Sequence, residues 1–185
     1  MQTEESKFSS RFYVRKLSEK DARQVYDLCR TNPVYYEHMK EEPSVQGIAA
    51  DMSALPPGSR PENKFFVGYY EKEDLAGNAS DSLIAVLDLI VAWPNEDTAL
   101  IGWLILHKSR QGRGIASRIV SELSEYLKSR GVSRIRLGYV KGNEESRRFW
   151  EKNGFLPTGE ESEREGYTIV VMQKELQKSL LQGFL

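Results

Sequence analysis

The sequence is poor in the residues that build disulfides and metal sites. It contains a single cysteine, Cys29, and two histidines, His38 and His107. One cysteine excludes an intramolecular disulfide and any zinc site that needs several thiolates, and two histidines are too few for a His-rich metal site. We therefore expect no metal. Cys29 falls on the apolar stripe of a predicted helix, which favours a buried packing thiol over a nucleophile.

An excess of charge and a long hydrophobic run are missing as well. The 26 basic and 27 acidic residues give a formal net charge of −1, so no global field attracts the chain to nucleic acid or to an anionic membrane. No apolar run approaches the length of a membrane span, and the polar residues 1–10 contain no secretory signal. We expect a cytoplasmic protein with neither nucleic acid nor membrane as partner.

What is present fits one globular domain. A chain of 185 residues can bury a sizeable core, and its hydrophobic content of 39% is ordinary for such a domain. No internal repeat or interdomain linker is visible. We divide the chain into a flexible N-terminal segment (1–9), a single domain (10–176) and a C-terminal tail (177–185), and we expect a monomer or a homodimer.

Hydrophobic periodicity predicts an alternation of strands and helices. Strands are expected over 11–17, 64–70, 82–92, 99–106, 132–140, 155–158 and 167–173, with a hairpin connection at 74–81 and a charged hairpin loop at 160–166. Helices are expected over 22–29 (after the N-cap Ser18), 34–39, 45–55, 115–127 and 144–153. This order predicts an α+β fold with a mixed, mostly antiparallel central sheet of about seven strands and helices on both faces.

The most informative stretch joins a buried strand to a helix through a basic, glycine-bearing turn. Residues 104–106 lead into the turn at 107–114, and the helix begins directly after Gly114. Glycine lets backbone amides point inward, and a helix N-terminus adds unpaired N–H groups and the positive end of its dipole. Such a turn can cradle a pyrophosphate, with Arg110 and Arg113 adding charge. The simpler alternative is an ordinary strand-to-helix turn.

Two well-known phosphate loops are excluded by their missing residues. A Walker loop needs Lys and then Ser or Thr after its last glycine, but Gly114 is followed by Ile115 and Ala116. A dinucleotide fingerprint needs a third glycine, where this chain has Ser117, and an acidic residue at the end of the next strand. That strand ends with residues 137–139, Leu-Gly-Tyr.

The turn resembles instead the first signature of the GCN5-related N-acetyltransferase (GNAT) superfamily, Gln/Arg-x-x-Gly-x-Gly/Ala, which residues 111–116 match. The second signature, an Asn followed by an aromatic pair and then Asn/Leu-Gly-Phe, is matched by Asn143, Phe149, Trp150 and residues 153–155. One helix and one strand separate the two signatures, as in the family. Two signatures in the right order are much more specific than either alone, and the resemblance covers about residues 10–176.

The resemblance implies acetyl-CoA as co-substrate and a sheet splayed into a V. It implies that the main chain of residues 104–106 pairs with pantetheine, that amides from 111–117 hold the pyrophosphate, and that Asn143 bonds the pantetheine arm. Phe149 and Trp150 would wall the thiol end, with helix-to-sheet packing as the alternative. The implied cofactor-binding residues are Leu104, Ile105, Leu106, Gln111, Gly112, Arg113, Gly114, Ile115, Ala116, Ser117, Asn143, Phe149 and Trp150.

The chain departs from many relatives at the two positions that handle protons. Those relatives place a tyrosine acid where this chain has Trp150, whose indole does not give up a proton usefully, and a glutamate base where it has Gly138. Two carboxylates are candidate catalytic residues in their place. Asp88 interrupts an apolar strand, where burial should perturb it; its alternative is a structural hydrogen-bond acceptor. The other candidate is Glu37.

Aromatic residues around Glu37 suggest where an acceptor binds. Tyr35, Tyr36 and His38 are its neighbours, and aromatic rings beside a carboxylate suit a cationic amine. A surface helix with its tyrosines packed inward is the alternative.

The sequence therefore predicts an enzyme that moves an acetyl group from acetyl-CoA to a primary amine of a small molecule or peptide, by direct attack in a ternary complex. The acceptor is not identified. The alternative is a non-catalytic acyl-CoA-binding regulatory module with the same fold, which the loss of the usual tyrosine and glutamate favours. A nucleotide-binding switch is disfavoured because the Walker residues are missing.

Overall fold

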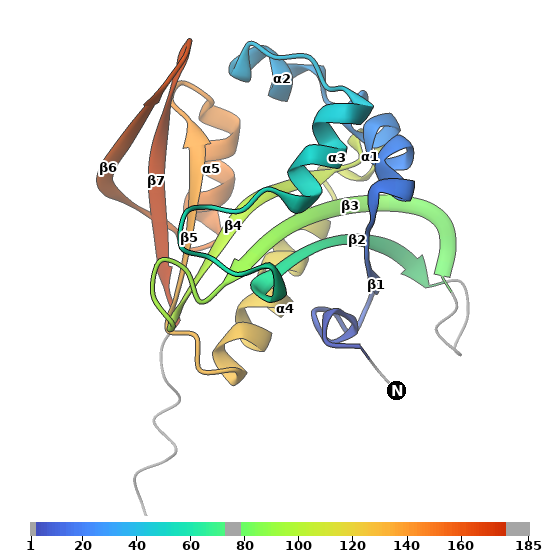
Figure 1. Cartoon of the computed structure of the whole chain (residues 1–185), viewed down its shortest axis with the longest axis horizontal. Coiled ribbons are helices and arrows are strands. Elements are labelled where there is room, and N and C mark those ends of the chain that lie inside the picture. The colour runs from blue at the N-terminus through green and yellow to red at the C-terminus, as the bar shows by residue number, and fades with distance from the viewer. Residues whose placement is uncertain (1–2, 73–78, 177–185) are drawn as a thin grey trace, which may run out of the picture.

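The computed structural model describes residues 3–72 and 79–176 (Figure 1). Its strands are β1 (Tyr13–Lys16), β2 (Lys64–Lys72), β3 (Ala79–Val91), β4 (Thr98–Leu106), β5 (Arg134–Val140), β6 (Leu156–Arg164) and β7 (Tyr167–Glu175). Its α-helices are α1 (Ala22–Cys29), α2 (Pro33–Met39), α3 (Val45–Ser53), α4 (Ile115–Ser129) and α5 (Glu144–Lys152). Short 3₁₀ turns lie at Glu5–Lys7, Glu19–Asp21, Pro61–Asn63 and Lys108–Arg110.

The strands form one seven-stranded sheet in the order β1-β2-β3-β4-β5-β7-β6. Every neighbouring pair is antiparallel except β4 and β5, which are parallel. Their pairing covers only Thr98–Ile101 against Arg134–Leu137, although both strands continue beyond it. The sheet therefore divides into two limbs that part toward the carboxyl ends of β4 and β5 (Figure 1). This confirms the predicted mixed sheet and its V shape.

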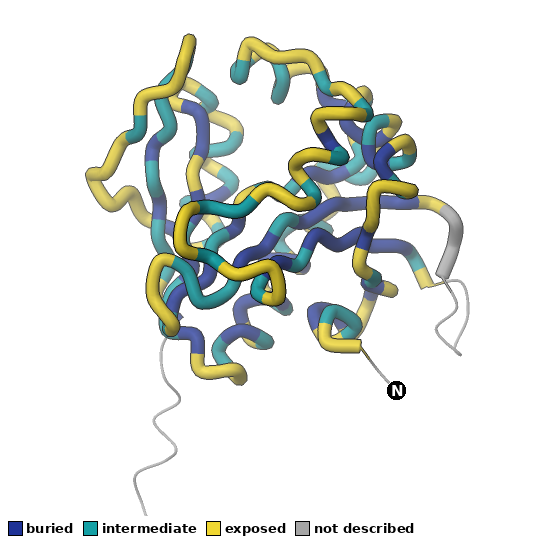
Figure 2. The backbone as a smooth tube through the Cα atoms, in the orientation of Figure 1, coloured by how far each residue is buried: buried dark blue, intermediate teal, exposed yellow. Residues whose placement is uncertain are grey.

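Helices cover both faces of the sheet, as predicted. One apolar cluster joins α1 and α3 to residues such as Phe66 and Val86. The other joins α4 and Trp150 of α5 to the alternate strand residues, such as Val67 and Leu87. Because successive strand residues point to opposite faces, the central strands β2, β3 and β4 are apolar on both. Figure 2 shows them as the most continuously buried part of the chain.

The local signals read from the N-terminal half are confirmed. Ser18 begins the first helical segment, and its N–H donates to Asp21 Oδ2 at 2.8 Å, so the aspartate fills the place of the usual glutamate in a capping box. Pro33 opens α2 at its first turn, where a missing N–H costs nothing. The connection predicted at 74–81 and the C-terminal tail fall largely outside the described residues.

The charged segment 160–166 was predicted as a loop, and this was wrong. β6 runs through it to Arg164, leaving a turn before β7 begins at Tyr167. Because β6 is the edge strand and exposed on both faces, it needs no apolar residues. It gains ion pairs instead, from Arg136 to Glu160 at 2.6 Å and from Lys141 to Glu161 at 2.9 Å.

The segment predicted as a flexible N-terminal extension contributes to the core. Phe8 is 1% exposed and packs against the rings of Phe65 and Tyr126, with centroid distances of 5.4 and 5.0 Å. Single-sequence periodicity does not detect such an anchor, because one aromatic residue in a polar segment has no repeat.

Gly138, where the resemblance leads one to look for a glutamate, has a steric reason to be glycine. A Cβ added there would lie 2.5 Å from Cγ2 of Ile169 on β7. A side chain at position 138, a carboxylate included, would therefore require Ile169 or the strands to shift.

We expect Gly138→Ala to lower the free energy of unfolding by about 1–3 kcal/mol, the usual cost of overpacking. Urea denaturation measures the change. Ile169→Ala removes the clashing methyl group, so the double variant should recover part of the loss relative to the sum of the two single changes. Strict additivity would contradict the steric explanation.

Candidate active site

The opening between the two limbs is bordered by two helix N-termini. β4 and β5 are parallel, so their carboxyl ends lie at the same edge of the sheet. β4 leads through residues 107–114 into α4, and β5 leads through residues 141–143 into α5. Both helices therefore begin at the open end of the V, where unpaired N–H groups and helix dipoles favour an anion.

The turn before α4 exposes its backbone. Gly112 and Gly114 have φ angles of 72° and 74°, in the left-handed region that favours glycine, and a Cβ at either position would meet open space. The first intrahelical bond of α4 runs from the Arg118 N–H to Gly114 O at 3.0 Å. The N–H groups of residues 115–117 thus precede the helical hydrogen-bond ladder and point toward the open end.

A polar cluster that the sequence analysis missed fixes this turn in place. The buried Asn32, just before α2, donates from Nδ2 to Leu106 O at 3.1 Å and accepts at Oδ1 from Gln111 Nε2 at 2.7 Å. The Lys108 N–H donates to Thr31 Oγ1 at 3.0 Å. The only signal was a polar pair before Pro33, which local reasoning interprets as a helix boundary.

Along β4, the main-chain groups of alternate residues face β3 on one side and the opening on the other. The His107 N–H donates to Ile84 O on β3 at 2.8 Å. Because alternate residues of a strand turn their polar groups to opposite sides, Ile105 also faces β3, whereas Leu104 and Leu106 face the opening. Leu106 O already accepts from Asn32. The strand geometry leaves Leu104 and the Leu106 N–H free to pair with a ligand and turns Ile105 to β3, while pairing of pantetheine with residues 104–106 stays a prediction.

The two arginines of the turn differ. Arg110 forms an ion pair with Glu71 at 2.9 Å, so part of its charge is already balanced, whereas Arg113 is exposed.

Ser117 Oγ accepts from Asn153 Nδ2 at 3.2 Å, which joins the start of α4 to the end of α5. The two signature segments are therefore in direct contact.

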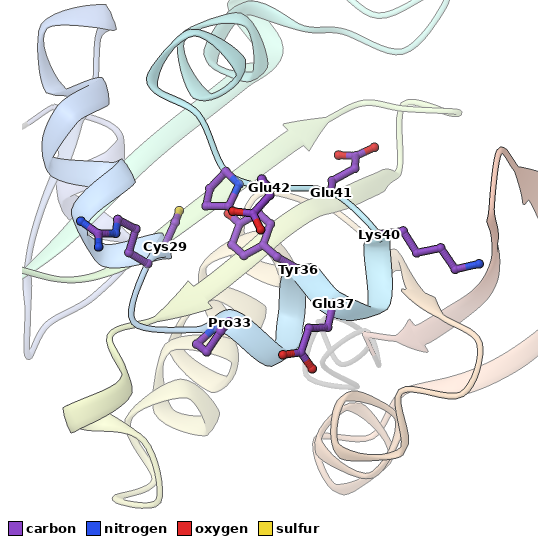
Figure 3. Close-up of a pocket in the computed structure, with 9 residues that line it drawn as sticks. Cys29, Pro33, Tyr36, Glu37, Lys40, Glu41 and Glu42 are labelled. Atoms are coloured by element: carbon purple, nitrogen blue, oxygen red, sulfur yellow. The ribbon is translucent and has the colours of Figure 1, made fainter.

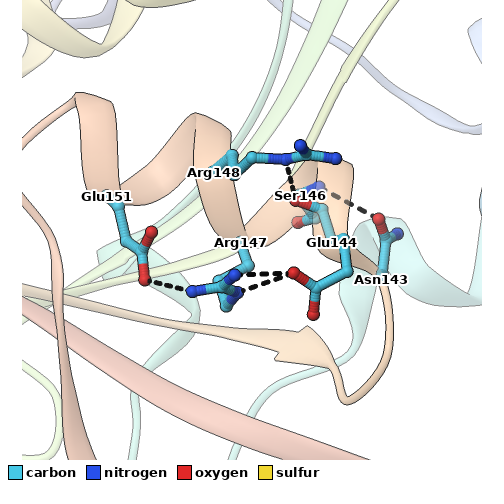
Figure 4. A network of polar contacts seen from close by, with 6 residues as sticks. All are labelled: Asn143, Glu144, Ser146, Arg147, Arg148 and Glu151. Carbon is cyan, nitrogen blue, oxygen red and sulfur yellow. Dashed lines mark hydrogen bonds and ion pairs between the residues drawn. The ribbon is translucent and has the colours of Figure 1, made fainter.

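Asn143 caps α5. Its Oδ1 accepts from the Ser146 N–H at 2.9 Å, and the helix continues with ion pairs from Arg147 to Glu144 and Glu151 (Figure 4). The cap places the asparagine at the open end of the V. Its predicted bond to the pantetheine arm stays a prediction.

The aromatic pair of α5 divides between packing and exposure to the opening. Trp150 is buried in the core and contacts Phe155 edge-to-face, with a centroid distance of 5.2 Å. Phe149 is only partly buried against the same core. Packing therefore accounts for Trp150, while the role of Phe149 beside a bound thiol stays a prediction.

Asp88 lies beside an irregularity of β4. It pairs with Trp103, whereas the next residue Leu89 pairs with Ile101, so Gly102 is an extra residue in a β-bulge. A Cβ on Gly102 would lie 2.9 Å from Asp88 Oδ2, which places the carboxylate directly over the bulge. This is also where β4 loses its pairing with β5.

The Asp88 carboxylate is partly buried, with its side chain 14% exposed, and only one of its oxygens has a hydrogen-bond partner among the described residues. Oδ2 accepts from Lys64 Nζ at 3.0 Å, and Oδ1 is buried without a hydrogen-bond partner among the described residues. Burial raises the pKa of Asp88, and the Lys64 ammonium opposes that rise. The bond from Lys64 agrees with the structural alternative for Asp88, while its catalytic role stays a prediction.

α2 bridges the two limbs. Tyr35 lies against Trp103 of β4, with ring centroids 6.4 Å apart. At the other end, a Cβ on Gly166 in the β6–β7 turn would lie 3.3 Å from Lys40 Cδ. The helix therefore spans the opening, with the more buried Tyr35 turned to the sheet.

Glu37 lies apart from Asp88. It is exposed on α2 and lines a cavity of about 390 Å³ together with Tyr36, Cys29 and the connection to α3 (Figure 3). Burial raises the pKa of the Cys29 thiol to about 11, which fits a packing role. His38 is partly buried on the same helix. The structure thus puts the two carboxylate candidates in different surroundings.

Within the described ranges, 3–72 and 79–176, no three His, Cys, Asp or Glu side chains are grouped so that they could hold a metal ion. Nor does any helix of the described chain have the length and apolar character to cross a membrane.

A sheet that parts beside a glycine-bearing helix start, with a second helix N-terminus opposite, is the architecture of acyl-CoA-dependent acyltransferases. The chain matches the model of the acetyltransferase (GNAT) family over residues 22–155. It belongs to this family.

Solved structures share the fold at low sequence identity. An acetyltransferase from Thermus thermophilus superposes with a TM-score of 0.68 at 18% identity, covering 90% of this chain and 97% of that one. The PaiA N-acetyltransferase from Thermoplasma acidophilum, solved with coenzyme A, gives 0.61 at 21% identity, covering 89% and 98%. The ribosomal-protein-S18-alanine N-acetyltransferase from Escherichia coli gives 0.62 at 13% identity, covering 94% and 99%. No curated protein matches the sequence significantly.

We expect Gly114→Asp to abolish coenzyme A binding, because it places a carboxylate among the N–H groups that would hold the pyrophosphate. Calorimetric titration with coenzyme A should show on the order of a 100-fold loss, from charge repulsion and loss of the N–H contacts. A Cβ there meets open space, so the cost to the fold is the backbone strain at a φ of 74°, about 1 kcal/mol. Gly58→Asp is the matched control, with a φ of 84° and equally open surroundings. Equal affinity of both variants would show that the turn is not the phosphate site.

Proposed function

We propose that the protein is an N-acetyltransferase that moves the acetyl group of acetyl-CoA to a primary amine of a small molecule or peptide. The observation that carries this proposal is the parting of β4 and β5 beside the exposed backbone at 112–117. Membership of the family and the coenzyme A complex of PaiA support the same donor. The N–H groups of the turn are suited to its pyrophosphate.

The geometry of β4 supports one path for the donor. With the pyrophosphate at the turn, the pantetheine arm would run back along the free edge from Leu106 to Leu104. The thioester would then reach the bulge at Gly102, where Asp88 lies. On this path the acyl group arrives beside Asp88 rather than beside the exposed Glu37.

The reaction requires little proton chemistry from the protein. The bound ammonium first loses a proton to solvent, and the neutral amine nitrogen attacks the thioester carbonyl in a ternary complex; a C–N bond forms, and the C–S bond breaks to release the thiolate. Asp88 as general base takes the second proton from the amine nitrogen and returns it through solvent to the thiolate, which leaves as free thiol. Because a thiolate is a good leaving group, alignment of the two substrates supplies much of the acceleration.

The acceptor would approach from the side of α2 and α3. Tyr35, Tyr36 and His38 lie on α2, which spans the opening, and Glu37 adds a negative charge at its surface. Aromatic rings and carboxylates favour a cationic amine over an anionic one. These residues are proposed as the acceptor wall.

Release of free thiol from acetyl-CoA, followed with an aromatic disulfide reagent across a panel of polyamines, amino acids and peptides with free N-termini, tests the proposal. The product should gain one acetyl group by mass spectrometry. Coenzyme A binding without transfer to any member of the panel would favour the non-catalytic module.

We expect Asp88→Asn to lower kcat on the order of 100-fold, as loss of a general base does, while coenzyme A affinity changes less than about twofold. Asparagine keeps the oxygen that accepts from Lys64, so the fold should persist. Glu37→Gln tests the competing candidate on the acceptor wall and should raise the KM of a cationic acceptor rather than lower kcat. A loss of kcat in the Glu37 variant alone would transfer the catalytic role to α2.

A further inference from the structure

Lys64 is a buried lysine with two defined contacts. The residue is 5% exposed, and its Nζ donates to Ala54 O at 2.6 Å and to Asp88 Oδ2 at 3.0 Å. Lys64 pairs with Ile90 across β2 and β3, and Phe66 pairs with Asp88. Lys64 therefore reaches Asp88 diagonally on the same face of the sheet, which a long side chain can do.

These contacts connect the sheet to the acceptor side of the molecule. Ala54 directly follows α3, so the ammonium satisfies a carbonyl at the carboxyl end of that helix, where a cation is favoured. The same ammonium holds one oxygen of Asp88 over the bulge at Gly102. One side chain thus fixes the carboxylate and the end of the acceptor-side helix relative to each other.

The charges that face Asp88 come from two elements. β2 contributes Lys64, which lowers the pKa of the Asp88 carboxyl against the larger upward effect of burial, and α3 contributes Asp51, which raises it. On β4, the residues that face Asp88 are Gly102 and Trp103, and neither of them titrates in the physiological range. Lys64 is therefore the counter-charge that favours the ionised carboxylate.

The ion pair with Lys64 uses one oxygen of Asp88, and Oδ1 is buried without a partner among the described residues. Such an atom costs free energy until a hydrogen-bond donor reaches it. An N–H of a bound amine would remove that cost.

We propose that Lys64 is a positioning residue of the candidate active site: it ties Asp88 Oδ2 to the carboxyl end of α3, holds the carboxylate against the β4 bulge, and leaves Oδ1 for the acceptor amine. The inference rests on the proposed function, in which Asp88 meets that amine. Lys64 itself touches neither substrate.

Carboxyl-¹³C aspartate labelling tests the inference without an acceptor. The Asp88 signal is assigned by its loss in Asp88→Asn and titrated in Lys64→Gln, which keeps a donor but removes the charge, and in Lys64→Arg, which keeps the charge. We expect the Asp88 midpoint to rise by about one unit or more in Lys64→Gln, the size of effect that a close opposite charge produces, and to stay near the original in Lys64→Arg. Lys72→Gln, at the exposed end of β2, is the control and should shift nothing.

An unchanged Asp88 midpoint in folded Lys64→Gln would overturn the inference; thermal unfolding and coenzyme A binding establish that the variant is folded. If Lys64→Gln does not fold, the inference is tested on the unsubstituted protein instead. Because the two groups are hydrogen-bonded, the Lys64 ¹⁵Nζ chemical shift must then respond to the ionisation of Asp88, and a Lys64 signal that does not respond would overturn the inference.

Kinetics separate positioning from a merely structural role. With acetyl-CoA, a linear diamine and a short peptide as probes, the acidic limb of kcat/KM should move to higher pH in Lys64→Gln, because Asp88 is then protonated over a wider range. The rate at high pH should approach that of the unsubstituted protein. A structural role would lower kcat at every pH and leave the limb in place, which would contradict the inference.

The two proposals can fail separately. If Asp88→Asn keeps full turnover while Lys64→Gln still shifts the Asp88 midpoint, the proposed catalytic role of Asp88 fails and Lys64 only orients a structural carboxylate. If Asp88→Asn loses turnover and the midpoint does not respond to Lys64, the proposed function stands and the inference about Lys64 falls.

Discussion

The constraint on which the structure depends is the short pairing between β4 and β5. After Ile101 and Leu137 the two parallel strands share no further ladder, so the main chain of β4 beyond the bulge has one free side. In a closed sheet those N–H and C=O groups would be satisfied by a neighbour. Here Leu106 O is satisfied by Asn32, and the remaining edge is directed at the opening where both helix N-termini lie. The sheet itself therefore creates a binding site for an extended ligand that ends in an anion.

Much of this arrangement could be predicted from the sequence because its signals are local. The apolar runs of β2 to β4, the alternation in β5, the cap at Ser18, the break at Pro33 and the glycines at 112 and 114 each reflect a preference of neighbouring residues, and all appear in the structure. Segment 160–166 was misjudged because an exposed edge strand carries the same charged residues as a loop. Whether β6 forms depends on its neighbour β7, which no local pattern specifies.

The contacts that sequence reasoning missed join residues far apart in the chain. Asn32 reaches Gln111, and Lys64 reaches Asp88; neither pair has a spacing that a periodic pattern could reveal. Asp88 was identifiable because a carboxylate in an apolar strand violates the expected pattern. Its partner was not, because a lysine at the start of a strand is normally a solvated residue. Exceptions to local rules mark functional positions, but their partners emerge only when the fold is known.

Packing explains why this chain lacks the tyrosine and the glutamate that many relatives have at positions 150 and 138. At position 138 the methyl group of Ile169 occupies the space that a side chain would need. At position 150 the indole fills the core beside Phe155. Both substitutions follow from how β7 and α5 pack in this chain, so they do not by themselves indicate lost activity. Acetyl transfer from a thioester requires chiefly a deprotonated amine held beside the carbonyl, and the partly buried Asp88, paired with Lys64, is the group we propose for that task.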